Sequence, residues 1–161
     1  MQIRHTIERC PQTYEIIRNL PGFCGDYPWC DALFSLHTHG TRLLPHRRID
    51  NLRIRIHLAI DIPEGSVIRV DQEIRQWESG KYMVFDESFE HETWNETNRN
   101  RTVLIVDVWH PALTVDERTI LLSIFSHVEV RKLFFIKRLK NINADTTMIL
   151  DLEEQVLGVR C

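Results

Sequence analysis

Residues 51–60, NLRIRIHLAI, carry a charged or titratable side chain at every second position from Arg53 to His57. Arg53, Arg55 and His57 alternate with apolar residues, and a period of two predicts a β-strand with these three side chains on one face. A guanidinium group is planar, stays charged in proteins and can bind a carboxylate with two parallel hydrogen bonds. The face either contacts solvent or, if it points inward, binds anions, because unpaired buried cations are costly.

Two histidines lie close to this strand or to the segments predicted to pair with it. His46 precedes the strand in LLPHRRID, and His91 lies in FDESFEHETW. Imidazoles from two separate strands could bind one metal ion, since neutral nitrogen ligands suit iron, zinc and copper. The chain has eight histidines, so spacing alone leaves a role on the surface or in the core open. His46 and His91 are therefore candidate metal ligands.

The candidate residues fall in a region of β character, residues 32–110. Short segments rich in branched and aromatic residues are separated there by Gly, Pro, Asp and Asn, which is typical of strands joined by turns. This spacing predicts a β-sandwich or barrel. Residues 11–20 suit a short helix, and Thr114 with Glu117 fits a capping box that predicts a second helix from about residue 115.

Length and composition restrict the class of protein. A chain of 161 residues suits one domain with its own core, and the formal net charge of −3 argues against a general nucleic-acid binder. No apolar run approaches the ~20 residues that span a bilayer, and the start lacks the apolar core of a signal peptide. We therefore expect a cytoplasmic protein with no membrane partner. The four cysteines form no CxxC pair and are expected to be reduced, structural thiols.

Four motifs follow one another in the chain: HRRIDNLRIRIHLAI, WESGK, FDESFEHETWN and RTVLIVDVWHP. Together they resemble the catalytic domain of the aspartyl/asparaginyl β-hydroxylase family over roughly residues 32–113. The resemblance implies a mainly β fold, a double-stranded β-helix of the jelly-roll, cupin-like type, with flanking N- and C-terminal helices. We expect a single domain over residues 1–161, with a catalytic β-barrel at about 32–113 and a C-terminal helical extension at about 114–161.

The resemblance also implies the site of a dioxygenase that depends on Fe(II) and 2-oxoglutarate. His46 and His91 take the places of the iron ligands, which are the catalytic residues of the family. Arg101 and Ser35 fall where the family binds the distal carboxylate of 2-oxoglutarate. His57 matches a histidine near the iron-bound end of this cosubstrate.

Arg53 and Arg55 match arginines that bind the acidic side chain being oxidised in the animal members of the family. The implied reaction uses Fe(II), 2-oxoglutarate and O₂ to hydroxylate an unactivated C–H bond, at the β-carbon of an aspartyl, asparaginyl or related amino-acid unit. That substrate would be a free amino acid, a residue in a peptide, or an amino acid bound to a carrier protein. The alternative is a non-catalytic β-barrel of the same fold that binds carboxylates.

Arg48 departs from the pattern of many non-haem iron oxygenases, which carry a metal-binding carboxylate two residues after the first histidine. Arg48 occupies that position here. Asp50, two residues further on, is either a third metal ligand or the partner that neutralises Arg48, and we favour the pairing. A halogenase, in which chloride takes the place of the carboxylate, is disfavoured because Arg48 is not small.

Overall fold

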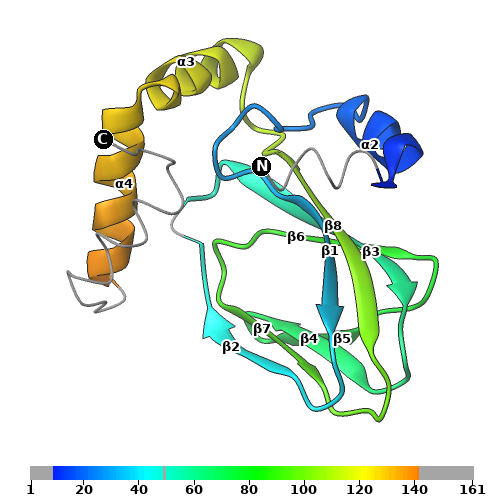
Figure 1. The fold of residues 1–161 in the computed structure, drawn as a ribbon. Coiled ribbons are helices and arrows are strands. Elements are labelled where there is room, and N and C mark those ends of the chain that lie inside the picture. The colour runs from blue at the N-terminus through cyan, green and yellow to red at the C-terminus, as the bar shows by residue number, and fades with distance from the viewer. Residues whose placement is uncertain (1–8, 49, 142–161) are drawn as a thin grey trace. The chain divides into compact units, whose positions relative to one another are not determined.

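Two four-stranded antiparallel sheets form the centre of the chain (Figure 1). This computed structural model describes residues 9–48 and 50–141. The first sheet has the order β1 (Ala32–His37), β8 (Arg101–Trp109), β3 (Arg53–Asp61) and β6 (Tyr82–Phe85). The second sheet has the order β2 (Arg42–His46), β7 (His91–Asn95), β4 (Ser66–Val70) and β5 (Glu73–Gln76).

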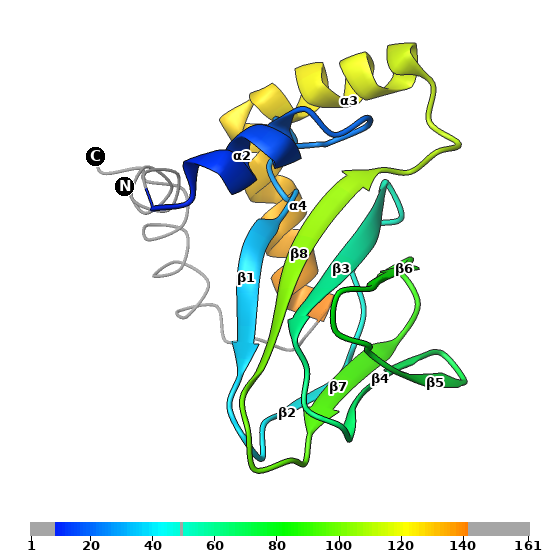
Figure 2. The ribbon, with the colours of Figure 1, turned by 90° about the vertical axis from the view of Figure 1, so that its right-hand side faces the viewer.

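The chain passes repeatedly from one sheet to the other. Of the consecutive strand pairs, only β4 and β5 are neighbours in the same sheet, and every other step changes sheet. Figure 2 shows β1, β8 and β3 side by side in one layer. Rolling two antiparallel sheets together in this way is the jelly-roll solution to exposed sheet edges. The predicted mainly β, double-stranded β-helix fold with flanking helices is thus confirmed.

The inner face of the first sheet is the polar face of β3. Arg53, Arg55 and His57 are buried, whereas the apolar residues between them are only half-buried. The apolar face points outward and packs beneath α2 (Pro11–Arg18), where Leu58 contacts the cluster that contains Ile17. A helix on the outside and a polar site on the inside therefore account for the alternation in this strand.

An apolar core occupies the interior between the sheets. It consists of Ala59, Ile68, Trp77, Val103 and Ile105. Two of these residues alternate along the inner face of β8, with Arg101 at one end of that face and Asp107 towards the other. The core thus separates two sets of buried charges on the same strand.

The chain divides into two units, residues 1–114 and 115–161, and each is described by itself. All the residues predicted to form the site belong to the first unit. Part of the predicted helical extension, residues 142–161, lies outside the described residues. A single domain over the whole chain stays a prediction.

Two helices make up the described part of the second unit, α3 (Val115–Ser126) and α4 (Val128–Asn141). The predicted helix start near residue 115 is confirmed, and Asp116 and Glu117 in the first turn suit the positive end of the helix dipole. Phe125 and Phe134 pack edge to face with ring centroids 5.4 Å apart, which joins the two helices. Within the described ranges, no helix has the length and apolar character needed to cross a membrane.

Candidate functional site

His46 and His91 are brought together by the pairing of β2 with β7. They are direct partners in the antiparallel register, and their ring centroids lie 4.2 Å apart. The Nδ1 atom of His46 lies 2.7 Å from the carbonyl oxygen of Leu44, and that of His91 lies 3.0 Å from the carbonyl oxygen of Phe89. A carbonyl oxygen only accepts, so each Nδ1 donates, and a ring that is neutral then has its lone pair on Nε2.

Burial keeps His91 in the form that binds metal. It lowers the pKa of His91 to about 4, so the ring is neutral at physiological pH. Within the described residues, no cluster of three or more His, Cys, Asp or Glu side chains is arranged to hold a metal ion. The carboxylate of Glu87 approaches one ring, with Oε1 3.6 Å from Nε2 of His91. The structure therefore offers two imidazole ligands on facing strands.

Arg101 is a buried cation without a partner. Arg101 is 2% exposed, and its Nε and Nη1 atoms find no hydrogen-bond partner among the described residues. The guanidinium carbon lies 4.7 Å from the centroid of the Trp77 ring. Burial lowers the pKa of Arg101 to about 10, which leaves it charged at neutral pH. An unpaired buried charge is costly, so an anion that bound to Arg101 would remove this cost.

Polar groups on two strands face the same space as Arg101. His57 of β3 is 5% exposed, and neither of its ring nitrogens has a partner in the described part of the chain. His37 of β1 is the direct register partner of Arg101, and its buried Nδ1 also finds no partner there. Ser35 pairs with Val103 of the inner core, so it shares the inner face of β1. We call Ser35, His37, His57 and Arg101 the anion subsite.

The pair of His46 and His91 lies close to the anion subsite. The ring of Phe85 stands 5.7 Å from the ring of His91 and 5.0 Å from the ring of His57. Burial lowers the pKa of His57 to about 3, so this ring is neutral and can donate or accept a hydrogen bond. A single ligand could therefore contact both sets of residues.

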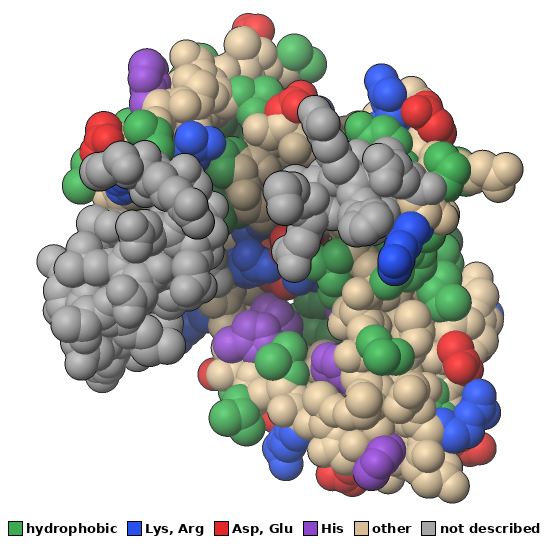
Figure 3. All heavy atoms as spheres, viewed as in Figure 1, with side chains coloured by type: hydrophobic (Ala, Val, Ile, Leu, Met, Phe, Trp, Pro, Cys, Tyr) green, Lys and Arg blue, Asp and Glu red, His purple; other side chains and the backbone are tan. Residues whose placement is uncertain are grey.

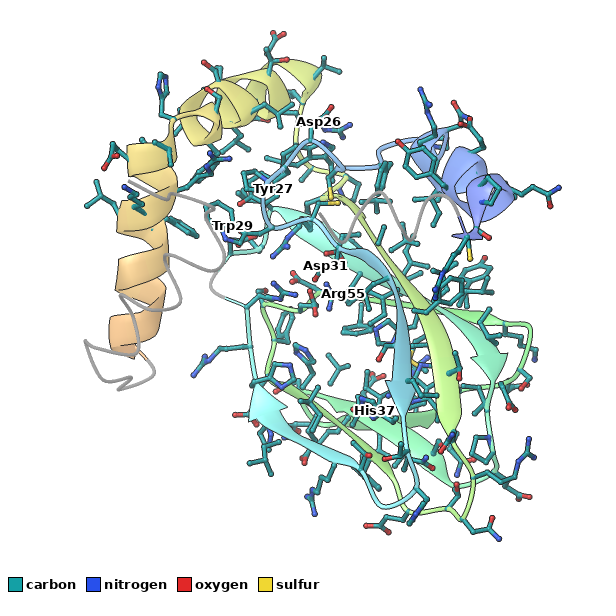
Figure 4. The ribbon with its side chains drawn as sticks, viewed as in Figure 1. Asp26, Tyr27, Trp29, Asp31, His37 and Arg55 are labelled. Atoms are coloured by element: carbon teal, nitrogen blue, oxygen red, sulfur yellow. The ribbon has the colours of Figure 1, made fainter. Side chains whose placement is uncertain are left out.

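Arg53 and Arg55 face inward as predicted, but the protein's own acids already bind them. Arg55 and Asp107 are register partners on β3 and β8, and Nε and Nη2 of Arg55 donate to the two carboxylate oxygens over 2.8 and 2.9 Å. Arg55 also donates to Asp31, which lies beside it in Figure 4. Its Nη1 lies 2.6 Å from the carboxylate of Glu87. Inward burial of this arginine therefore does not by itself require a visiting anion. Substrate binding by Arg53 and Arg55 stays a prediction.

Arg53 shares Asp107 with Arg55, because its Nη1 lies 3.6 Å from that carboxylate, and it also contacts groups that Arg55 does not. Its Nη2 lies 3.4 Å from the carboxylate of Asp50, and its Nη1 donates to the backbone carbonyl of Trp29. The guanidinium carbon also lies 5.6 Å from the centroid of the Tyr27 ring. The segment that precedes β1 thus forms a wall of the site.

The predicted pairing of Arg48 with Asp50 is wrong. Arg48 donates to Asp31 over 2.6 Å, and its Nε lies 3.4 Å from Glu87. Asp50 instead accepts from the backbone N–H of Leu52 and pairs with Arg53. Its short turn directs the carboxylate along the chain towards β3, away from Arg48.

Seven charged residues form one network at this end of the barrel, which we call the ion-pair cluster. Its members are Arg48, Arg53, Arg55, Asp31, Asp50, Glu87 and Asp107. Figure 3 shows basic, acidic and histidine side chains close to one another near the middle of this view.

Sequence reasoning missed three of the acids in this cluster. The sequence pattern could have identified Asp107, since it lies on the inner face of β8, an even number of residues from Arg101. Asp31 and Glu87 left none, because they come from turns whose partners lie far away in the chain. Arg48 and Glu87 are joined further by a backbone hydrogen bond, in which N–H of Arg48 donates to the carbonyl of Glu87 over 2.8 Å.

The fold and the site define a class of protein: a cupin-like barrel with a histidine pair and, on its inner face, an arginine with two nitrogens that find no partner among the described residues. The chain belongs to the aspartyl/asparaginyl β-hydroxylase family. Residues 1–111 match the family described as "Aspartyl/Asparaginyl beta-hydroxylase". This match covers the first unit almost completely and includes both histidines and Arg101.

Curated relatives match part of the chain. The chain is 48% identical over 86 residues to the aspartyl/asparaginyl beta-hydroxylase of Mus musculus, covering 53% of this chain and 12% of that protein. It is 37% identical over 108 residues to the ornithine lipid ester-linked acyl 2-hydroxylase of Rhizobium tropici, covering 65% of this chain and 36% of that protein. The match thus spans 36% or less of either relative.

Solved structures resemble the fold at low sequence identity. The cupin domain of a transcriptional regulator from Enterobacter cloacae is 14% identical with a TM-score of 0.45, covering 57% of this chain and 92% of that one. A cupin protein from Bacteroides fragilis is 12% identical with a TM-score of 0.44, covering 53% of this chain and 70% of that one.

Proposed function

We propose that this chain is an Fe(II)- and 2-oxoglutarate-dependent dioxygenase that hydroxylates an unactivated C–H bond in an amino-acid substrate. The observation that carries the proposal is the histidine pair, with rings 4.2 Å apart and each Nδ1 committed to a backbone carbonyl. Family membership favours a hydroxylase, and the two relatives described above are named as hydroxylases of aspartyl or asparaginyl units and of an acyl chain.

The residues present fit a ferrous ion. Imidazole nitrogen suits iron, and a backbone carbonyl behind each ring fixes the tautomer and the ring orientation. His46 and His91 would hold the metal. A third protein ligand is not required if water and the cosubstrate complete the coordination, and Arg48 is turned into the ion-pair cluster by Asp31 and Glu87.

The anion subsite fits a dicarboxylate cosubstrate. Arg101 would bind the distal carboxylate of 2-oxoglutarate, and Ser35 on the neighbouring strand would donate a further hydrogen bond. His57, neutral and without a partner in the described residues, would contact the end of the cosubstrate nearer the histidine pair. The unsatisfied hydrogen-bonding capacity of these groups supports the assignment.

Bound iron and 2-oxoglutarate would supply the oxidant that places an oxygen atom from O₂ into the C–H bond. The chain's own residues would bind, orient and shield the reactants. Phe85 and Trp77 would exclude water beside His57, His91 and Arg101. No side chain is assigned as a general base.

Metal and cosubstrate binding test the proposal before a substrate is known. Purified protein should bind Fe(II) under anaerobic conditions and develop the visible charge-transfer absorption that 2-oxoglutarate gives when it chelates ferrous ion. His46→Ala and His91→Ala should abolish both metal retention and this absorption. His39→Ala is the matched control, because His39 is exposed and lies outside the site.

Turnover separates the enzyme from the non-catalytic alternative. The active enzyme should convert 2-oxoglutarate to succinate in air, and addition of the correct substrate should raise the rate. Tight binding of 2-oxoglutarate without iron-dependent succinate formation, across a broad panel of amino acids, peptides and carrier-bound amino acids, would favour the carboxylate-binding module. Full activity in both histidine variants would contradict the proposed site.

A further inference from the structure

Every arginine of the ion-pair cluster is already paired with a carboxylate of the protein. In Arg101, by contrast, two nitrogens have no hydrogen-bond partner among the described residues. Each of the three nitrogens of the Arg55 guanidinium lies within 2.9 Å of a carboxylate oxygen. Arg53 is bound by Asp50 and by the carbonyl of Trp29. A substrate carboxylate would have to displace one of these partners.

The charge balance of the cluster also disfavours an acidic group. Three arginines stand among four carboxylates, which leaves the cluster with one negative charge when all are ionised. A substrate carboxylate placed here would meet like charges in a partly buried environment, where the repulsion is strong.

Asp31 is the accessible acid of the cluster. Its side chain is 29% exposed, compared with 10% for Asp50, 7% for Glu87 and 0% for Asp107. Both Arg48 and Arg55 donate to Oδ2, and Oδ1 accepts no hydrogen bond from any described residue. The backbone is fixed by a reciprocal pair of hydrogen bonds with Asp107, each of 2.9 Å. Asp31 thus offers a fixed oxygen that is available to a ligand.

We propose that the group bound beside the histidine pair is a cation, an ammonium or guanidinium group of the substrate, which donates to Oδ1 of Asp31. This inference rests on the proposed function and replaces the expectation that Arg53 and Arg55 bind an acidic side chain. Glu87 joins the two regions, because Oε1 lies 2.6 Å from Arg55 and 3.6 Å from His91. Asp31 and Arg48 are the residues that set this specificity.

Matched probes test the charge of the substrate group. The N-acetyl amides of ornithine, norvaline and glutamate have side chains of similar length that are positive, neutral and negative. Their affinities are measured by calorimetry on the full chain loaded with Mn(II) and 2-oxoglutarate. The ornithine probe should bind about tenfold more tightly than the glutamate probe, since a hydrogen bond between charged groups is worth about that factor.

Two substitutions should move this preference in opposite directions. Asp31→Asn removes the acceptor charge and releases Arg48 and Arg55, so the preference for ornithine should vanish or reverse. Arg48→Gln removes a competing cation from Asp31, so the preference should increase. Asp61→Asn is the matched control, because Asp61 is exposed and pairs only with Arg99 on the surface. It should leave the order of the probes unchanged.

The wild-type ranking alone can overturn the inference, so it does not depend on the variants folding. Tighter binding of the glutamate probe, equal affinities, or no binding of the ornithine probe would each contradict a cationic substrate group. Failure of Mn(II) or 2-oxoglutarate to bind would contradict the proposed function instead. The probe titrations would then be repeated on metal-free protein, where the ion-pair cluster alone should still rank them.

Discussion

Arg55 and Arg101 lie on neighbouring strands of one sheet and differ in their pairing with other side chains. Arg55 is neutralised by acids of the protein, while Arg101 is buried over Trp77 with two nitrogens unpaired in the described structure. The paired residue stabilises the barrel and the unpaired residue costs stability. Binding sites are often destabilised in this way, because a ligand later provides the missing partner.

Replacement of Arg101 should separate stability from binding. Arg101→Met removes an uncompensated charge and keeps an apolar chain over Trp77, so the free energy of unfolding without ligand should rise by about 1 kcal/mol or more. Urea denaturation measures this change. The same variant should lose the thermal stabilisation that 2-oxoglutarate gives to wild type in the presence of Mn(II).

Arg99→Met provides the comparison for this experiment. Arg99 is two residues away, is 63% exposed in its side chain and pairs with Asp61 on the surface. Its replacement should change the unfolding free energy by less than about 1 kcal/mol and leave the ligand-induced thermal shift intact. A destabilised Arg101→Met variant would show that this arginine has a partner that the ligand-free structure does not reveal.

His57 should make stability depend on pH. Burial lowers its folded pKa to about 3 from an ordinary value of 6.5, so the unfolded state binds more protons between pH 6.5 and 3. Stability is therefore fully present above pH 6.5 and falls as the pH decreases through this window. His57→Gln removes the titrating group, and the difference in unfolding free energy between wild type and variant should follow that curve.

Comparing wild type with His57→Gln separates the effect of His57 on stability from that of Glu87, which changes stability in the opposite direction with pH. Burial raises the pKa of Glu87 to about 7, which favours the folded state at low pH, but Glu87 is present in both proteins and its effect cancels. The measurement is denaturant unfolding at several pH values from 7 down to 4, which covers the plateau above pH 6.5 and most of the fall towards the pKa of about 3. A flat difference would mean that His57 titrates normally.

At the level of strands, the alternation of polar and apolar residues predicted where β3 lies in the sequence. It did not predict which face of β3 points into the barrel. Residues 51–60 were predicted as a strand and Arg53–Asp61 is observed. A period of two is the same whether the polar face points outward or inward. The position of α2 decides the matter, because Ile17 covers the apolar side, and no local pattern in the strand records which helix will pack there.

The cross-strand pair of Arg55 and Asp107 should hold β3 to β8. Asp107 has a fully buried side chain and binds Arg55 through both oxygens. Asp107→Asn leaves a buried guanidinium with fewer charged partners and should lower the unfolding free energy by about 3 kcal/mol. Asp61→Asn, at the exposed end of β3, should cost less than about 1 kcal/mol.

Adding Arg55→Met to Asp107→Asn should restore part of the lost stability. The second change removes the charge that the first leaves poorly compensated, so the two effects should not be additive. A double-mutant cycle in urea measures the coupling energy. Additive losses would show that Glu87 and Asp31 are sufficient partners for Arg55 and that Asp107 acts independently.

At the scale of the whole molecule, the motifs in order along the chain predicted the fold and the two histidines. The contacts that bring those histidines together join strands nearly 50 residues apart, as the pairing of His46 with His91 shows. Asp31 and Glu87 could not be predicted, because they come from connections whose geometry depends on how both sheets close. The ion-pair cluster is thus a product of the tertiary fold rather than of any single segment.

The first unit should carry the complete binding site by itself. His46, His91 and the anion subsite all lie within residues 1–114, which form one of the two compact units. A fragment that ends at Thr114 should therefore unfold cooperatively and bind Mn(II) and 2-oxoglutarate with affinities within about threefold of the full chain, a difference below 1 kcal/mol. Calorimetry on both proteins measures this. If the fragment folds, as shown by a cooperative urea transition, yet binds 2-oxoglutarate far more weakly, residues 115–161 must contribute to the site.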